Sequence, residues 1–122
     1  MSNKEPFSIS KRLKSFVYAF NGLKLFFRTE HNARIHIAAA ILVVFLGKLL
    51  KISNCEWCLL SVVIGIVFIS EIFNTAIEQL TDMISPEYSE KAKIVKDLAA
   101  GAVLMASVIA LTVGLIVFVS KI

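Results

Sequence analysis

A stretch of 23 residues near the C-terminus, residues 98–120, contains no ionisable side chain. A helix needs about 20 mainly apolar residues to cross a bilayer, so this stretch is long enough to span a membrane. Two further stretches, about residues 33–50 and 57–80, are nearly as apolar. Because lipid offers the backbone no hydrogen-bond partners, such segments must be helical. The sequence therefore predicts an all-α integral membrane protein with three transmembrane helices.

The composition agrees with this class. Apolar residues make up 57% of the chain and charged residues 18%, whereas soluble domains average about 45–50% and about 25%. With 122 residues, we expect one membrane domain, residues 1–122. Two cysteines exclude a disulfide scaffold, and we expect the CxxC pair Cys55 and Cys58 to be incidental.

The segment before the first span has its own pattern. Apolar residues recur there at steps of three and four, while lysines and arginines occupy other faces. This pattern predicts an amphipathic helix within residues 1–30, lying in the cytoplasmic membrane interface. The apolar positions are Ile9, Leu13, Phe16, Val17, Phe20, Leu23 and Phe27.

Basic residues also predict the orientation of the spans. Seven precede the first span and three lie between the second and third, against three on the opposite side. Cytoplasmic segments carry the excess of Lys and Arg, so the N-terminus and the second loop are expected in the cytoplasm. The net charge of +4 then reflects topology, and we expect no nucleic-acid partner. Asn54 to Glu56 is expected to form the external turn, and Pro86 to end the second span.

A polar stripe marks the end of the second span. Glu71, Asn74, Glu78 and Asp82 lie within an arc of roughly 80° on one helix face. Glu71 follows fourteen uncharged residues, and an ionised carboxylate at such depth costs several kcal/mol unless it is paired or hydrated. A solvated helix end would explain Asp82 taken alone. It would not explain Glu71, so a paired or metal-binding stripe is the better interpretation of the set.

These residue types suit phosphoryl transfer. Carboxylates bind magnesium together with phosphate groups, and a carboxylate near a hydroxyl can act as its general base. Glu30 precedes the first span, and Lys96 with Asp97 leads into the third; a lysine there can neutralise phosphate charge. The chain has neither a GxxxxGK[ST] loop nor a GxGxxG loop. A nucleotide would therefore have to bind between helices.

Three segments carry a resemblance to a known family. Residues 71–82, EIFNTAIEQLTD, resemble the E-x-x-N-[ST]-A-I-E-x-x-x-D signature of the small prokaryotic diacylglycerol kinases, which include undecaprenol kinases. Residues 96–104, KDLAAGAVL, and 30–36, EHNARIH, resemble its K-D-x-x-[AS]-[AG]-A-V-L and E-x-N-x-R-x-H segments. The resemblance covers nearly the whole chain. It implies a homotrimer in the bacterial cytoplasmic (inner) membrane, with cytoplasmic active sites at subunit contacts.

The resemblance also implies roles for single residues. Glu71 would be the catalytic base, and Glu30 and Glu78 would hold Mg²⁺. Asn74 would position groups beside the base, and Asp82 would support the nucleotide. The remaining residues expected on the nucleotide side are Lys11, Tyr18, Glu87, Tyr88, Ser89, Lys96 and Asp97.

The activity implied is that of an ATP-dependent lipid kinase, which transfers the γ-phosphoryl group to a lipid hydroxyl. Diacylglycerol, giving phosphatidic acid, is the first expected substrate. Undecaprenol, giving undecaprenyl phosphate, is the alternative. A different class also accommodates an intramembrane acid: a small non-enzymatic transporter or channel subunit in which Glu71 couples protons.

Overall fold

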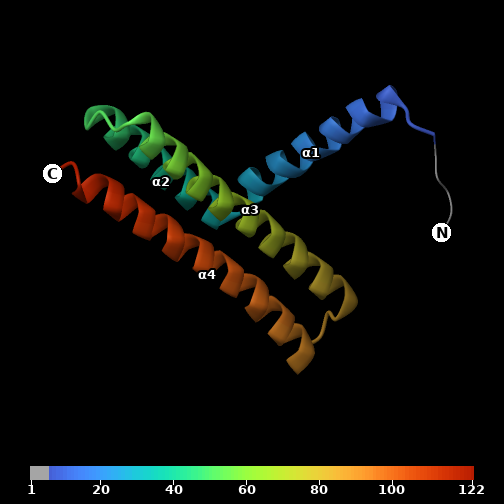
Figure 1. The fold of residues 1–122 in the computed structure, drawn as a ribbon. Helices are drawn as coiled ribbons and strands as arrows, with labels where there is room; N and C mark the ends of the chain where they lie inside the picture. Colours follow the sequence, from blue (N-terminus) through green and yellow to red (C-terminus); the bar gives the residue numbers. More distant parts are fainter. Residues whose placement is uncertain (1–5) are drawn as a thin grey trace. The chain divides into compact units, whose positions relative to one another are not determined.

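The computed structural model describes residues 6–122, which form four helices (Figure 1). They are α1 (Ile9–Thr29), α2 (His31–Leu49), α3 (Asn54–Ile84) and α4 (Glu90–Val119). The last three are each long and apolar enough to cross a membrane. The prediction of an all-α chain with one N-terminal helix before three spans is therefore confirmed. The first five residues of the expected amphipathic segment, including Lys4, lie outside the described residues.

The chain divides into two units, Met1–His31 and Asn32–Ile122. The first unit contains α1, which begins after Ser8, whose side-chain oxygen accepts a hydrogen bond from the Lys11 backbone N–H at 3.5 Å. The helix ends at Glu30, whose backbone is extended. Apolar side chains along α1, such as Phe16 and Phe20, are largely exposed. Such a stripe suits a helix lying on a membrane surface.

In the second unit, the turn between α2 and α3 lies earlier than the sequence analysis predicted. Asn54 to Glu56 is not a turn but the first turn of α3. Ser53 caps this helix: its hydroxyl accepts from the Glu56 N–H, and the Glu56 carboxylate accepts from the Ser53 N–H. This reciprocal capping box starts the helix at Asn54. The chain reverses just before it, at Lys51, which has a positive φ of 52°.

The third and fourth helices are longer than the bilayer requires. At 1.5 Å per residue, the 31 residues of α3 extend about 46 Å, against a hydrocarbon core of about 30 Å. The helix ends at Ser85, as Pro86 predicts. α4 begins eight residues before the expected span at 98, because the Ser89 hydroxyl caps it by accepting from the Ala92 N–H at 3.0 Å. Both helices therefore project beyond the membrane.

The core of the second unit lies near the α2–α3 turn. Ile52, Leu60 and Val117 are buried together, and Trp57 packs against them. Gly47 allows this packing, because a Cβ atom there would lie 2.6 Å from the Trp57 ring. We name Ile52, Trp57, Leu60 and Val117 the turn-end core.

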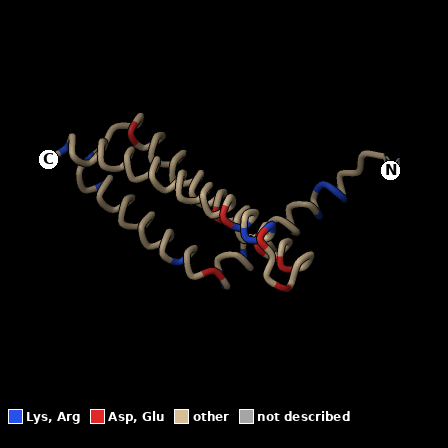
Figure 2. The backbone as a smooth tube through the Cα atoms, turned by 90° about the horizontal axis from the view of Figure 1, so that it is seen from below, with Lys and Arg blue, Asp and Glu red and all other residues tan. Residues whose placement is uncertain are grey.

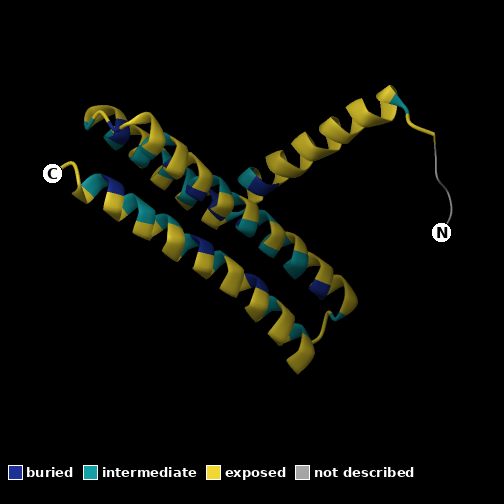
Figure 3. Cartoon of the chain, viewed as in Figure 1, coloured by how far each residue is buried: buried dark blue, intermediate teal, exposed yellow. Residues whose placement is uncertain are grey.

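Away from this core, few side chains are buried (Figure 3). α3 and α4 run side by side (Figure 1), and the small residues Ala99 and Ala106 are among those that α4 buries. Large apolar side chains such as Leu104 and Ile116 are exposed along α4. An exposed apolar surface of this kind is typical of membrane helices, which lipid or other helices cover.

Candidate functional site

Glu71 is the one carboxylate buried within residues 6–122, with 4% of its surface exposed. It lies on α3, and its Oε1 is 3.1 Å from Nε2 of His36 on α2. The His36 ring also meets the Phe68 ring edge to face, with 6.1 Å between their centroids. A buried carboxylate requires a partner, and in this protein α2 supplies it. We call Glu71 and His36 the buried pair.

The length of α3 indicates how deep the buried pair lies. Tryptophan is enriched at membrane interfaces, which makes Trp57 the natural start of the membrane-embedded part. Twenty residues later, about 30 Å along the helix, the opposite boundary falls near Ile77. Glu71 then lies about 9 Å inside this boundary and Asp82 about 8 Å beyond it. The polar stripe therefore passes from the hydrocarbon into water.

Asn74 and Glu78 form the next contact along the stripe. The Asn74 amide donates to Oε1 of Glu78 at 3.2 Å. The other polar atom of Asn74, Oδ1, is buried and has no hydrogen-bond partner among the described residues. An unpaired buried acceptor costs about 1–3 kcal/mol. A hydroxyl or N–H group from a bound molecule would satisfy it.

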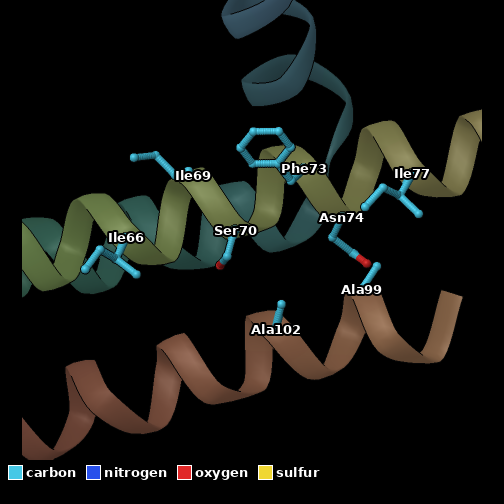
Figure 4. Close-up of a pocket in the computed structure, with 8 residues that line it drawn as sticks. All are labelled: Ile66, Ile69, Ser70, Phe73, Asn74, Ile77, Ala99 and Ala102. Carbon is cyan, nitrogen blue, oxygen red and sulfur yellow. The ribbon is translucent and has the colours of Figure 1, made fainter. Parts of the chain in front are cut away.

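This asparagine lines an apolar groove between α3 and α4 with a volume of about 380 Å³ (Figure 4). In the close-up, Asn74 extends from α3 toward α4, beside Ala99. The second polar side chain in the lining, Ser70, already donates its hydroxyl to the Val67 carbonyl at 2.8 Å. The groove thus offers an apolar wall and one unpaired amide oxygen. Its full lining is Ile66, Ile69, Ser70, Phe73, Asn74, Ile77, Ala99 and Ala102.

Charged residues gather where α3 ends and α4 begins. Lys96 on α4 forms an ion pair with Asp82 on α3, and Lys93 pairs with Asp97 at 2.6 Å. All four side chains are substantially exposed, so a soluble anion could reach both lysines. Figure 2 shows that α3 and α4 also contain long stretches without charge.

The three site residues expected in the loop before α4 have local contacts. Tyr88 donates its hydroxyl to Oε1 of Glu90 at 2.8 Å, and this hydrogen bond to the carboxylate raises the pKa of the phenol. The Glu87 carbonyl accepts from the Ser85 hydroxyl at 3.2 Å. Ser89 uses its hydroxyl to cap α4. These contacts order the loop, and a nucleotide role for its residues stays a prediction.

The remaining three expected site residues lie in the N-terminal unit. Lys11 is in the first turn of α1, Tyr18 is exposed at its middle, and Glu30 is the residue that ends it. Within residues 6–122 no group of three or more His, Cys, Asp or Glu side chains converges on one point. Magnesium commonly uses only one or two protein carboxylates and completes its shell with phosphate and water. The assignment of Glu30 and Glu78 to the metal stays a prediction.

His36 is the site residue that the sequence analysis missed. The signal was the second histidine of the EHNARIH segment, which falls inside the mainly apolar first span. Its partner lies 35 residues away, so no local spacing could join the two. Cys55 and Cys58, in contrast, are exposed free thiols.

Comparison with known proteins identifies the family. Residues 17–118 match the model of the prokaryotic diacylglycerol kinases. An undecaprenol kinase of Bacillus subtilis is 41% identical over 113 residues, which cover 93% of this chain and 92% of that protein. A diacylglycerol kinase of Synechocystis is 40% identical over 84% of this chain but only 59% of its own length. A diacylglycerol kinase of Escherichia coli is 33% identical over 80% of each chain.

The matched region contains the buried pair, the polar stripe and the ion pairs at the start of α4. A kinase family also accounts for the carboxylates and lysines near the ends of the membrane helices, and it makes ATP the co-substrate. The chain belongs to the prokaryotic diacylglycerol kinase family and is a membrane lipid kinase.

Proposed function

We propose that this kinase phosphorylates undecaprenol, with diacylglycerol as the second candidate. The match to the undecaprenol kinase extends over more than nine tenths of both chains. The matches to the diacylglycerol kinases have lower identity or cover much less of the relative. The sequence analysis expected diacylglycerol first and undecaprenol second, and this proposal reverses that order.

The observation that carries the catalytic part is the position of Glu71. It is buried on α3, about 9 Å inside the membrane boundary, where the hydroxyl of a lipid can reach a carboxylate. Glu71 takes the proton of the lipid hydroxyl as the alcohol oxygen attacks the γ-phosphorus of ATP. The bond between that phosphorus and the β,γ-bridging oxygen breaks, and ADP leaves.

Asn74 and its groove fit the lipid. The apolar lining suits a hydrocarbon chain, and the buried Oδ1 of Asn74 places one hydrogen-bond acceptor within that lining. Asn74 follows Glu71 by three residues, so both side chains lie on neighbouring parts of one helix face. This arrangement presents a single hydroxyl to the base.

The nucleotide binds at the exposed end of α3 and α4. Lys96 neutralises phosphate charge, and Asp82, which is paired with it, holds its side chain in place. Asp97, Lys11, Tyr18, Glu87, Tyr88 and Ser89 complete the nucleotide side. Glu30 and Glu78 hold Mg²⁺, which neutralises charge on the phosphates when it is bound. Carboxylate oxygens are the ligands that this ion prefers, so the donor set fits.

This end faces the cytoplasm of a bacterial inner membrane. Lys91, Lys93 and Lys96 lie here, and seven further basic residues precede α2 or lie in its first turn, against three at the opposite side. The chain forms a homotrimer, supported by the apolar surface that α4 leaves exposed. Residues of the N-terminal unit then complete sites at subunit contacts.

The test is phosphoryl transfer with purified protein, Mg²⁺ and labelled ATP, offering undecaprenol and diacylglycerol in parallel mixed micelles. We expect label on undecaprenol and a much lower rate with diacylglycerol. Label on diacylglycerol alone would contradict the assignment of undecaprenol as the substrate. Absence of label on both would contradict the kinase assignment and would favour the transporter alternative.

A further inference from the structure

His36 joins α2 to the polar stripe of α3 through its contact with Glu71. Its Nε2 lies 3.1 Å from Glu71 Oε1, and about a quarter of the His36 side chain is exposed, against 5% for Glu71. The Phe68 ring packs against the imidazole in an edge-to-face arrangement. The imidazole is thus held between two side chains of α3 one turn apart.

A carboxylate is a useful base only if its free oxygen points at the substrate. The terminal torsion of glutamate is broad, so burial alone leaves its orientation poorly defined. A donor at Oε1 defines it, and Oε2 is the oxygen that His36 does not use. For Nε2 to donate to Oε1, the imidazole proton must be on Nε2.

We propose that His36 is a positioning residue of the kinase reaction: its Nε2–H donates to Glu71 Oε1 and directs Oε2 toward the lipid hydroxyl. This inference rests on the proposed role of Glu71 as the base. His36 touches neither substrate and acts through the carboxylate alone. Similar positioning, a fixed group that orients a catalytic partner through a hydrogen bond, is a general feature of active sites.

The decisive experiment compares three replacements of His36 in steady-state kinetics with ATP and lipid varied separately. His36→Leu removes the donor, and we expect kcat to fall at least about tenfold, toward the ~100-fold that misplacing a reacting group by about 1 Å can cost. KM for ATP stays unchanged. His36→Gln carries an N–H₂ group near the position of Nε2, and it is expected to restore kcat to within about threefold of wild type.

Two further variants separate positioning from folding. His36→Asn is polar but too short to reach Oε1, so its kcat should also fall at least about tenfold, and it supplies this measurement if the leucine variant fails to fold. His31→Leu makes the same change at an exposed histidine of the same helix and should leave kcat unaltered. In the background of Glu71→Gln, His36→Leu should cause no further loss, because both changes remove one function.

The outcomes distinguish this inference from the function on which it rests. A wild-type protein that phosphorylates neither lipid contradicts the kinase assignment. An active wild-type protein whose His36→Asn variant keeps full kcat overturns the positioning role alone. Equal losses in His36→Asn and His36→Gln also overturn it, because a donor that reaches Oε1 would then have no effect.

Discussion

The two ends of the three-helix unit are built on different principles. At one end, the turn-end core packs apolar side chains around Trp57, and the Glu56–Lys121 ion pair at 2.9 Å lies nearby. At the other end, polar contacts replace the core, and an open groove remains between α3 and α4. The first end has the features of structural packing. The second holds buried polar groups at an energetic cost that packing alone does not explain.

The comparison shows which charges serve the fold. Glu56 caps its own helix and pairs with a lysine at the membrane surface. These two structural contacts account for the presence of a carboxylate at this position. Glu71 lies within the apolar part of the same helix, and its partner His36 comes from another span. Substitutions at the two ends should therefore separate stability from catalysis.

The largest effect is expected for Glu71→Gln. The amide keeps the size of the side chain but cannot take the hydroxyl proton, so kcat should fall about 10²–10⁴-fold, the usual contribution of a general base. Phosphate transfer to lipid measures it, and thermal unfolding in detergent should show a folded protein. Glu56→Gln is the matched control at the other end and should leave kcat unchanged. Near-normal transfer by Glu71→Gln would remove this residue from the role of base.

Glu78→Gln should change the dependence on magnesium. Loss of one carboxylate ligand lowers the affinity for Mg²⁺. We expect the Mg²⁺ concentration for half-maximal rate to rise at least about tenfold, a loss of affinity that is common when groups around a metal are substituted. Glu30→Gln should behave in the same way. A magnesium titration at saturating ATP measures both, with Glu56→Gln again as the control. An unchanged titration curve would exclude the substituted residue as a ligand.

Gly47→Ala should disturb the turn-end core and spare the chemistry. The added Cβ would lie 2.6 Å from the Trp57 ring, and overpacking of this kind typically costs about 1–3 kcal/mol. Denaturation in detergent measures the loss, while kcat per folded protein should stay constant. Gly65→Ala is the matched control, because a Cβ at Gly65 meets no atom within 4 Å. Equal stability of the two variants would show that Trp57 moves aside without penalty.

The smallest effect concerns the pH response of the loop before α4. The Tyr88 pKa is raised, first by its hydrogen bond to Glu90, so folding favours the protonated phenol. The associated stability is present below the unfolded pKa of about 10 and is lost as pH rises through the higher folded value. Ultraviolet titration of tyrosinate should show Tyr88 ionising late. Glu90→Gln should lower the midpoint, and Tyr88→Phe should remove it; an unaltered midpoint in Glu90→Gln would contradict this cause.

Much of the fold could be predicted because the information is local. Residues 98–120 have no ionisable side chain, and Pro86 marks the end of a helix, so length and composition were sufficient for the spans. The prediction for Asn54 to Glu56 was wrong because polar residues suit both a turn and a helix start. The reciprocal hydrogen bonds of Ser53 and Glu56 decide between them.

The sequence by itself determined the three spans and the polar stripe, because helical periodicity places Glu71, Asn74, Glu78 and Asp82 on one face whatever surrounds them. Only the tertiary structure decided which partners they have. His36 meets Glu71 across 35 residues, and Lys96 meets Asp82 across 14, because α2 and α4 each pack antiparallel to α3. Contacts between helices depend on packing, and no repeat along one helix encodes them.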